Sequence, residues 1–359
     1  MPNRAEQGTW PFLRELRLLG SVYVVRGTDR AFLHEPRTMN NELQRTQRTR
    51  GCCSGERSSA SMETMYDAIV PVVENRPLTG GHFLLSLYSP RQARVTRPGQ
   101  FAMLRLLGRS DVLLRRPMSI VDVAPAFRPA RAGPKPGTTT RKPTRLELIQ
   151  LLYKVVGRGT RLMAELRPGE RVGLLAPLGH GFFSEEYMER ARQADEVLHV
   201  AGGIGIAALL LPARDLARAG IPQRLFFGGR TKADLVGVQA FKPFIKAAVL
   251  ATENASCGHH GYVTGPLEEY LERHRKKKFL LMVCGPWAML AASVELARKY
   301  GHPCLVSMEN RMGCALGVCL GCCIRVVGEG HGAYQRVCTE GPVFWADQVV
   351  WERESAPNT

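Results

Sequence analysis

The chain has 359 residues, enough for two or three domains, and a formal net charge of +17 from 49 Lys and Arg against 32 Asp and Glu. Nucleic-acid binding is not expected from this charge, because no aromatic residues alternate with Arg or Lys as a base-stacking surface requires. No stretch reaches the roughly 18 consecutive apolar residues of a membrane span, and residues 1–20 lack the apolar run of an export signal, so we expect a cytoplasmic protein without membrane contact.

Residues 1–64 do not show the hydrophobic periodicity of a folded domain. Residues 37–50 are polar and basic, and Cys52 and Cys53 follow in a stretch with Gly and Ser but no nearby partner. We interpret the segment as a disordered basic extension. A basic arm or a vicinal redox pair is the functional alternative.

Residues 65–194 form a first predicted domain of short strands separated by turn signals, a pattern typical of an antiparallel barrel or sandwich. Strands are expected within residues 66–75, 82–88, 100–107, 115–123, 146–156 and 172–182. Residues 124–145 are rich in Pro, Gly, Thr and Arg, and we interpret them as a mobile insertion between two strands.

Two stretches of this domain carry residues suited to an anion. Arg116 and Ser119 lie at an expected strand and could hold a phosphate, although a surface ion pair is the simpler role for Arg116. Gly159 and Thr160 lie at the start of an expected short helix, where free backbone N–H groups can hold an anion.

Residues 195–303 form a second predicted domain in which strands alternate with helices, as in a doubly wound parallel sheet. One strand runs into Gly202, Gly203, Ile204 and Gly205 and then into a helix, so the N–H groups there could hold a pyrophosphate. The stretch is not G-x-G-x-x-G, and a tight turn without a ligand explains it equally well.

A second motif, Cys284-Gly285-Pro286, ends another strand of this domain, and ligands bind at the carboxyl ends of strands in open α/β sheets. The family resemblance described below implies that this ligand is a nicotinamide nucleotide, and Cys284 is then the residue best placed to lie near its ring, the alternative being a buried thiol that only packs. Arg230 and Lys232 follow a further strand and leave the choice between NAD and NADP open.

Residues 304–359 contain the most specific signal, a C-x4-C-x2-C run with a fourth cysteine downstream. The four residues are Cys314, Cys319, Cys322 and Cys338. The run has the opening spacing of plant-type [2Fe–2S] ferredoxins, in which four thiolates hold two irons. The neighbouring Cys323 is a fifth thiol, which this spacing leaves for packing on the next strand.

Gly313, Gly317 and Gly321 are expected to give this loop the positive-φ freedom that turns its N–H groups toward sulfur. Zinc is the first alternative, but zinc ribbons usually use two C-x2-C knuckles and this chain has one. Disulfides are the second alternative, and they need an oxidising compartment that the sequence does not indicate.

The order of these motifs resembles the ferredoxin–NADP reductase superfamily over residues 65 to about 303. Arg116-Pro117-Met118-Ser119 is similar to the flavin-binding R-x-Y-S of that superfamily, with Met118 in place of tyrosine. The expected fold class is α/β plus all-β: an antiparallel FAD-binding β-barrel (65–194), a doubly wound parallel-sheet nucleotide-binding domain (195–303) and a small C-terminal [2Fe–2S] domain (304–359).

The cysteine-bearing stretches 309–322 and 337–344, with 115–120, 153–160 and 177–182, resemble the electron transfer subunits of class 1B dihydroorotate dehydrogenases over residues 65 to about 350. The resemblance implies a [2Fe–2S] cluster on Cys314, Cys319, Cys322 and Cys338. It implies FAD on Arg116, Pro117, Met118, Ser119, Leu152, Tyr153, Lys154, Gly159 and Thr160. It implies NAD on Gly202, Gly203, Gly205, Cys284, Gly285 and Pro286.

The function implied by this resemblance is electron transfer from the FMN of a dihydroorotate dehydrogenase catalytic subunit, through the [2Fe–2S] cluster and FAD, to NAD+, in pyrimidine (UMP) biosynthesis. The implied partner is that catalytic subunit, in a heterotetramer with two copies of each chain. No residue of this chain is expected to act as a catalytic acid or base. The alternatives are a reductase subunit of another oxidoreductase complex, a cluster-based redox sensor and a zinc-stabilised binding module.

Overall fold

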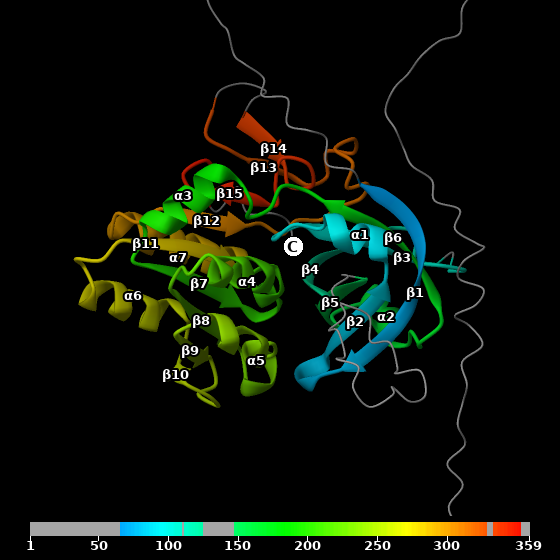
Figure 1. Cartoon of the computed structure of the whole chain (residues 1–359), viewed down its shortest axis with the longest axis horizontal. Coiled ribbons are helices and arrows are strands. Elements are labelled where there is room, and N and C mark those ends of the chain that lie inside the picture. Colours follow the sequence, from blue (N-terminus) through cyan, green and yellow to red (C-terminus); the bar gives the residue numbers. More distant parts are fainter. Residues whose placement is uncertain (1–64, 110, 125–146, 329–332, 353–359) are drawn as a thin grey trace, which may run out of the picture.

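The computed structural model describes residues 65–109, 111–124, 147–328 and 333–352. The expected extension 1–64, with Cys52 and Cys53, and all but the first residue of the expected insertion lie outside these residues. Figure 1 shows two large bodies side by side, a barrel and a sheet flanked by helices, with a small hairpin above their junction. No helix of the described residues is long and apolar enough to cross a bilayer.

Six antiparallel strands close the first body into a barrel in the order β1-β2-β5-β4-β3-β6. They are β1 (Tyr66–Pro77), β2 (His82–Tyr88), β3 (Phe101–Leu106), β4 (Arg116–Ala124), β5 (Leu148–Lys154) and β6 (Arg171–Leu178). Alternate residues of a strand face the same side, so Leu85 and Leu87 of β2 are both fully buried inside. Two short helices connect these strands: α1 (Pro90–Val95), which the sequence did not predict, and α2 (Arg158–Ala164).

Seven strands form the second body, in the order β10-β9-β8-β7-β11-β12-β15, and all are parallel except β15 at one edge. They are β7 (Glu196–Gly202), β8 (Gln223–Gly229), β9 (Ala247–Thr252), β10 (His259–His260), β11 (Phe279–Cys284), β12 (Cys304–Ser307) and β15 (Val343–Trp345). The helices around them are α3 (Glu185–Gln193), α4 (Leu210–Arg218), α5 (Val238–Phe241), α6 (Thr264–Arg273) and α7 (Trp287–Lys299).

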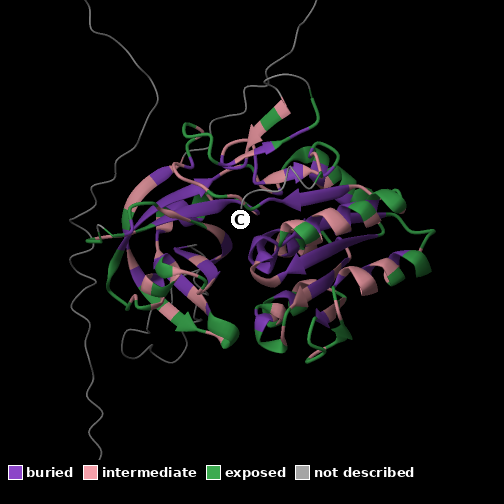
Figure 2. Ribbon diagram, turned by 180° about the vertical axis from the view of Figure 1, so that it is seen from behind, coloured by how far each residue is buried: buried purple, intermediate pink, exposed green. Residues whose placement is uncertain are grey.

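Both faces of this sheet are covered by helices. Leu198 and Val200 of β7 pack in one core with residues of α6 and α7. Val197 and Ala201, whose side chains alternate with these, pack in another core with residues of α3, α4 and α5. Figure 2 shows the strands as a buried inner layer and exposed residues on the outer turns of the helices. The doubly wound parallel sheet is thereby confirmed.

The cysteine segment is joined to both bodies. After β12 the chain forms the three-cysteine loop, then the hairpin of β13 (Cys323–Arg325) and β14 (Tyr334–Arg336), and returns as β15 beside β12. The turn after β6 meets this returning chain, because the His180 N–H donates to the Gly341 carbonyl at 2.6 Å and the Val343 N–H donates to the His180 carbonyl at 3.3 Å. The segment therefore touches the barrel and the sheet at once.

The barrel and the sheet also meet directly. The 3-10 helix η4 (Gly203–Ala208) packs its Ile206 in the same core as Leu152 of β5 and Val121 of β4. Two ion pairs cross the same junction, Lys154 with Asp234 and Arg214 with Asp122, each with an N···O distance of 2.5 Å. The end of β7 is in this way held against the strands that carry the predicted flavin residues.

Candidate functional site

The three-cysteine loop lies between β12 and β13, with Cys319 exposed and Cys314 partly exposed. The backbone N–H groups of Leu316 and Cys319 point at Cys314 Sγ, with N···S distances of 3.3 and 3.4 Å. Burial raises the pKa of Cys314, but these N–H donors and the contact with the Cys319 thiol outweigh it and lower the pKa to about 7. The loop therefore favours a thiolate, the form that binds metal.

The positive-φ positions of this loop differ from those expected. Gly317 has a φ of 76°, but the other two left-handed positions are Ala315 and Leu320, so the expectation was wrong for Gly313 and Gly321. Cβ atoms placed on these two glycines would lie 3.4 and 3.6 Å from Cys319 Sγ, an ordinary contact distance, so both glycines lie beside that sulfur without being required by close packing.

Cys322 and Cys338 form a second pair of thiols, and each is only 2% exposed. Burial, together with the hydrogen bond and charge of the neighbouring Cys322 thiol, raises the pKa of Cys338 to about 12. The Gly317 N–H, from the apex of the three-cysteine loop, also donates to Cys338 Sγ and so links the two pairs. The structure thus brings the four cysteines named from the sequence into two neighbouring pairs.

This pairwise arrangement suits two irons. A [2Fe–2S] cluster needs four thiolates spread over two irons, which two adjacent pairs can supply. The residues therefore fit the cluster. Cys323, half-buried on β13, lies close enough to Cys338 and Cys319 for their charges to act on its thiol, and only the sequence spacing separates it from the four assigned cysteines.

The residues predicted to hold FAD come together on one side of the barrel. Arg116 of β4 lies against the start of α2, since a Cβ on Gly159 would meet Arg116 Nε at 2.2 Å. Arg116 Nη1 donates to the Leu114 carbonyl. The Thr160 hydroxyl accepts the N–H groups of Val156 and Gly157 at 2.9 and 3.1 Å, which fixes the turn that enters the helix.

The three predicted residues of β5 have different surroundings. Tyr153 is 1% exposed, donates its hydroxyl to Asn75 Oδ1 at 3.0 Å and stacks on Phe83, so its ring supports the barrel. Burial raises the pKa of its hydroxyl to about 12. Leu152 and Lys154 point instead toward the sheet domain, as described for the junction.

The two nucleotide motifs pack on each other at the carboxyl edge of the sheet, because β7 and β11 are neighbours and Cys284 pairs with Ala201. A Cβ on Gly205 would lie 2.3 Å from the Cys284 carbonyl oxygen, and one on Gly202 would lie 2.8 Å from Pro286 Cδ. Close backbone approach therefore requires glycine at Gly205, whereas the atoms nearest to a Cβ on Gly202 belong to the side chains of Met289 and Pro286. The sequence predicted a helix directly after this turn, whereas η4 intervenes before α4.

Cys284 is 1% exposed, and burial raises the pKa of its thiol far above the ordinary value, so the thiol is neutral. It contacts Ser307 at the end of the neighbouring β12. Its place beside a nicotinamide stays a prediction. Asp234, which the sequence analysis missed, could have been found from Thr231-x-x-Asp234 after β8, since Asp234 accepts the Thr231 N–H at 3.1 Å as well as pairing with Lys154.

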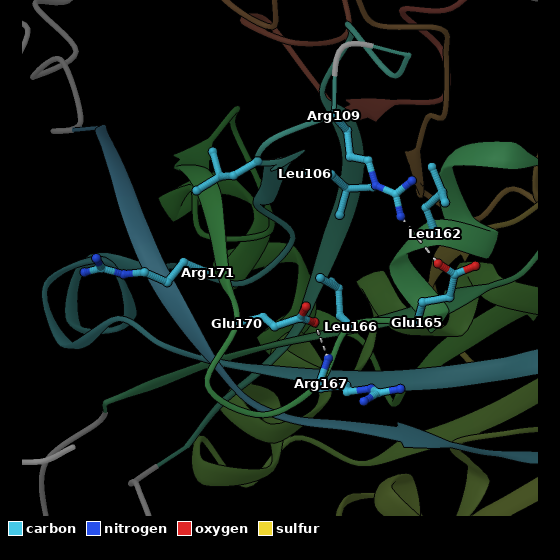
Figure 3. Close-up of a pocket in the computed structure, with 9 residues that line it drawn as sticks. Leu106, Arg109, Leu162, Glu165, Leu166, Arg167, Glu170 and Arg171 are labelled. Carbon is cyan, nitrogen blue, oxygen red and sulfur yellow. Dashed lines mark hydrogen bonds and ion pairs between the residues drawn. The ribbon is translucent and has the colours of Figure 1, made fainter. Parts of the chain in front are cut away.

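A cavity of about 570 Å³ opens elsewhere on the barrel, and Figure 3 shows its lining. Arg109 and Glu165 face each other across it at 3.6 Å, and Glu170 accepts the Arg167 N–H at 2.6 Å. None of its lining residues belongs to the predicted sites.

Solved structures with the same architecture point to a class of reductases. The chain matches a structure titled as the NADH-dependent reduced ferredoxin-NADP oxidoreductase with a TM-score of 0.62 and 26% identity, over 80% of this chain and 95% of that one. A ferredoxin NADP+ reductase from Neisseria gonorrhoeae matches at 15% identity and a TM-score of 0.50, over 68% of this chain and 94% of that one, which supports the fold alone. The class is thus a ferredoxin reductase-like oxidoreductase with an added cysteine segment.

Sequence relatives narrow this class. Residues 309–350 match the family model of the iron–sulfur cluster binding domain of dihydroorotate dehydrogenase B. The dihydroorotate dehydrogenase B (NAD+) electron transfer subunit of Desulforamulus reducens is 33% identical over 81% of this chain and 100% of that protein. The corresponding subunit of Geobacillus thermodenitrificans is 34% identical over 78% of this chain and 96% of that protein. The chain belongs to the family of dihydroorotate dehydrogenase B electron transfer subunits.

Proposed function

We propose that this chain accepts electrons from the FMN of a dihydroorotate dehydrogenase catalytic subunit and delivers them to NAD+ during pyrimidine biosynthesis. Family membership over four fifths of the chain carries this proposal. FAD, a [2Fe–2S] cluster and NAD are the cofactors. A cluster exchanges single electrons, a nicotinamide accepts a hydride, and a flavin can do both, which is the chemistry that connects the two ends.

Each cofactor has a proposed set of residues. Cys314, Cys319, Cys322 and Cys338 would hold the cluster. Arg116, Pro117, Met118, Ser119, Leu152, Tyr153, Lys154, Gly159 and Thr160 would hold FAD. Gly202, Gly203, Gly205, Cys284, Gly285 and Pro286 would hold NAD. The described residues hold these three sites in place relative to one another. The contacts of His180 with the chain after Cys338 fix the cysteine segment to the barrel. The packing of η4 on β5 fixes the glycine turn to the same barrel.

The partner is a catalytic subunit that carries FMN, and we propose a heterotetramer with two copies of each chain in the cytoplasm. The three-cysteine loop carries an apolar rim of exposed side chains at alternate positions of the sequence around the exposed Cys319. The rim consists of Leu316 (47% exposed), Val318 (78% exposed) and Leu320 (60% exposed). Apolar side chains gathered on a surface loop are typical of a docking site, and docking here would bring the partner next to the first pair of cysteines.

Placing a charge on this rim is expected to weaken the complex. Val318→Asp should raise the Kd for the catalytic subunit by at least roughly tenfold, because a carboxylate would be buried at an apolar contact. NADH-dependent dye reduction by the isolated subunit should not change. Affinity is measured by biolayer interferometry, with Ile69→Asp as a control, because Ile69 is 53% exposed on β1 of the barrel and belongs to no proposed site. Equal affinity of both variants for the partner would place the docking surface elsewhere.

The function itself is tested by anaerobic co-expression of this chain with its candidate catalytic subunit. The purified complex should contain FMN, FAD, two irons and two sulfides per pair of chains, and should reduce NAD+ when dihydroorotate is added. A complex that contains these groups but reduces NAD+ only with another donor would assign the chain to a different oxidoreductase.

A second candidate function has one specific observation in its favour. The similarity to the structure of the NADH-dependent reduced ferredoxin-NADP oxidoreductase spans 80% of this chain. A reductase subunit of a ferredoxin-linked complex is therefore the second candidate. Reduction of the purified complex by reduced ferredoxin, with no response to dihydroorotate, would select it.

A further inference from the structure

An ion pair encloses the fourth cysteine. Arg336 ends β14, and Glu340 lies in the turn that follows, with Cys338 between them. Arg336 Nε donates to Glu340 Oε2 at 2.9 Å, and Arg336 Nη2 donates to Glu340 Oε1. The contact is therefore bidentate and uses both carboxylate oxygens. The backbone N–H of Arg336 also donates to Glu340 Oε2, at 2.7 Å. The turn is closed from the other direction, because the Glu340 N–H donates to the Arg336 carbonyl at 2.9 Å.

The remaining arm of the same guanidinium reaches the three-cysteine loop. Arg336 Nη1 donates to the Gly317 carbonyl at 3.0 Å, across 19 positions of sequence. Gly317 lies between Cys314 and Cys319, and a Cβ on it would be 3.1 Å from Arg336 Nη1. The Gly317 N–H donates to Cys338 Sγ. The N–H and the carbonyl of Gly317 are therefore both bonded to the segment around the fourth cysteine.

We propose that Arg336, oriented by Glu340, is a positioning residue for the iron–sulfur cluster: its guanidinium clamps the three-cysteine loop onto the turn of Cys338 and places a positive charge beside the cluster. The inference rests on the proposed assignment of the cluster to the four cysteines. Only a planar fork with several fixed N–H donors can bond a carboxylate at two points and a carbonyl at a third, which a lysine cannot do.

An ordinary surface ion pair is the simpler reading, and it predicts little effect when either partner is removed. Two features argue against it. The side chains are only 37% and 32% exposed, and the guanidinium joins two segments that carry different cysteines of the set. Groups that orient metal ligands typically change metal affinity by roughly 10- to 100-fold when they are removed.

The clamp is tested in the full-length protein, purified anaerobically with its partner. Arg336→Gln should release iron to a chelator such as bathophenanthroline at least roughly tenfold faster than the unchanged protein. Glu340→Gln should also release iron faster. The matched control is Arg325→Gln, because Arg325 lies in the same hairpin and pairs at 3.1 Å with Glu352, which belongs to neither of the two segments that Arg336 joins.

The reduction potential separates a charge effect from a loss of structure. The reduced cluster is more negative by one charge, so a nearby cation stabilises it. Arg336→Gln should therefore lower the cluster potential, whereas Glu340→Gln, which leaves the cation unbalanced, should raise it. Arg336→Lys should keep the potential near its original value while restoring iron retention only in part.

Iron release from Arg336→Gln within twofold of the Arg325→Gln control would overturn the clamp, as would potential shifts of the same sign in the Arg336 and Glu340 variants. Arg336→Gln purified with FAD but no cluster would support it. If Arg336→Gln and Arg336→Lys both lacked FAD as well, the effect would be on global folding and the proposal would fail. Absence of iron from the unchanged protein would instead refute the proposed function.

Discussion

Replacing Cys322 with alanine is expected to abolish the cluster and to slow NAD+ reduction by the complex at least about 100-fold. Loss of a group that only orients a metal ligand typically lowers activity by roughly 10- to 100-fold. Loss of the ligand itself should lower the rate of NAD+ reduction by at least as much. Cys322 is 2% exposed and hydrogen-bonds with Cys338, so no solvent molecule can easily replace its sulfur. Iron and sulfide analysis and the visible spectrum of the purified complex report the loss.

The control for this experiment is the adjacent thiol. Cys323→Ala removes a half-buried cysteine at the start of β13 that lies near Cys319 and Cys338 but is not assigned to either pair. It should keep the cluster, and both variants should retain NADH-dependent dye reduction, which needs FAD but no cluster. Loss of the cluster from Cys323→Ala with its retention in Cys322→Ala would exchange the roles of the two residues.

Gly205→Ala is expected to lower the free energy of unfolding by about 3 kcal/mol and to weaken NAD binding at least roughly tenfold. A methyl group there would lie 2.3 Å from the Cys284 carbonyl oxygen and 2.8 Å from the Gly285 N. These are backbone atoms of the strand end and cannot rotate away, so the turn or the Cys284-Gly285-Pro286 segment must move. Chemical unfolding followed by circular dichroism and calorimetric titration with NAD measure the two effects.

A glycine at the far end of α4 provides the comparison. Gly220 has a φ of 72°, and a Cβ there would meet nothing within 4 Å. Gly220→Ala should therefore cost only about 1 kcal/mol, for the left-handed backbone alone, with NAD affinity unchanged. Equal destabilisation by the two substitutions would show that close packing at Gly205 is not what requires glycine.

Local sequence patterns predicted most of the elements that carry the site. β2 has the predicted bounds, His82–Tyr88, and the strands ending at Gly202 and Cys284 lie where the glycine turn and the C-G-P motif indicated. These predictions were possible because alternation of apolar residues and turn residues act over a few positions. The cysteine spacing acts over a similarly short range, since three of the four cysteines lie in one loop between β12 and β13, and their role as cluster ligands stays a prediction.

Contacts between distant segments could not be predicted in this way. Lys154 and Asp234 are 80 positions apart, and Arg336 reaches Gly317 from another strand. The prediction of positive φ at Gly313 and Gly321 was wrong, because Ala315 and Leu320 have positive φ instead. The residue after Ala315, Leu316, directs its N–H at Cys314 Sγ. Composition cannot indicate which residue of a loop meets that requirement.

The sequence by itself determined the class of fold, the four cysteines and the two nucleotide motifs, because each depends on residue types at short, regular spacing. Tertiary structure alone decided that β15 returns antiparallel to β12. It also decided that the cysteines form two pairs and that Arg336 ties those pairs together. These features depend on which surfaces meet after the chain has folded, and spacing along the sequence does not specify that.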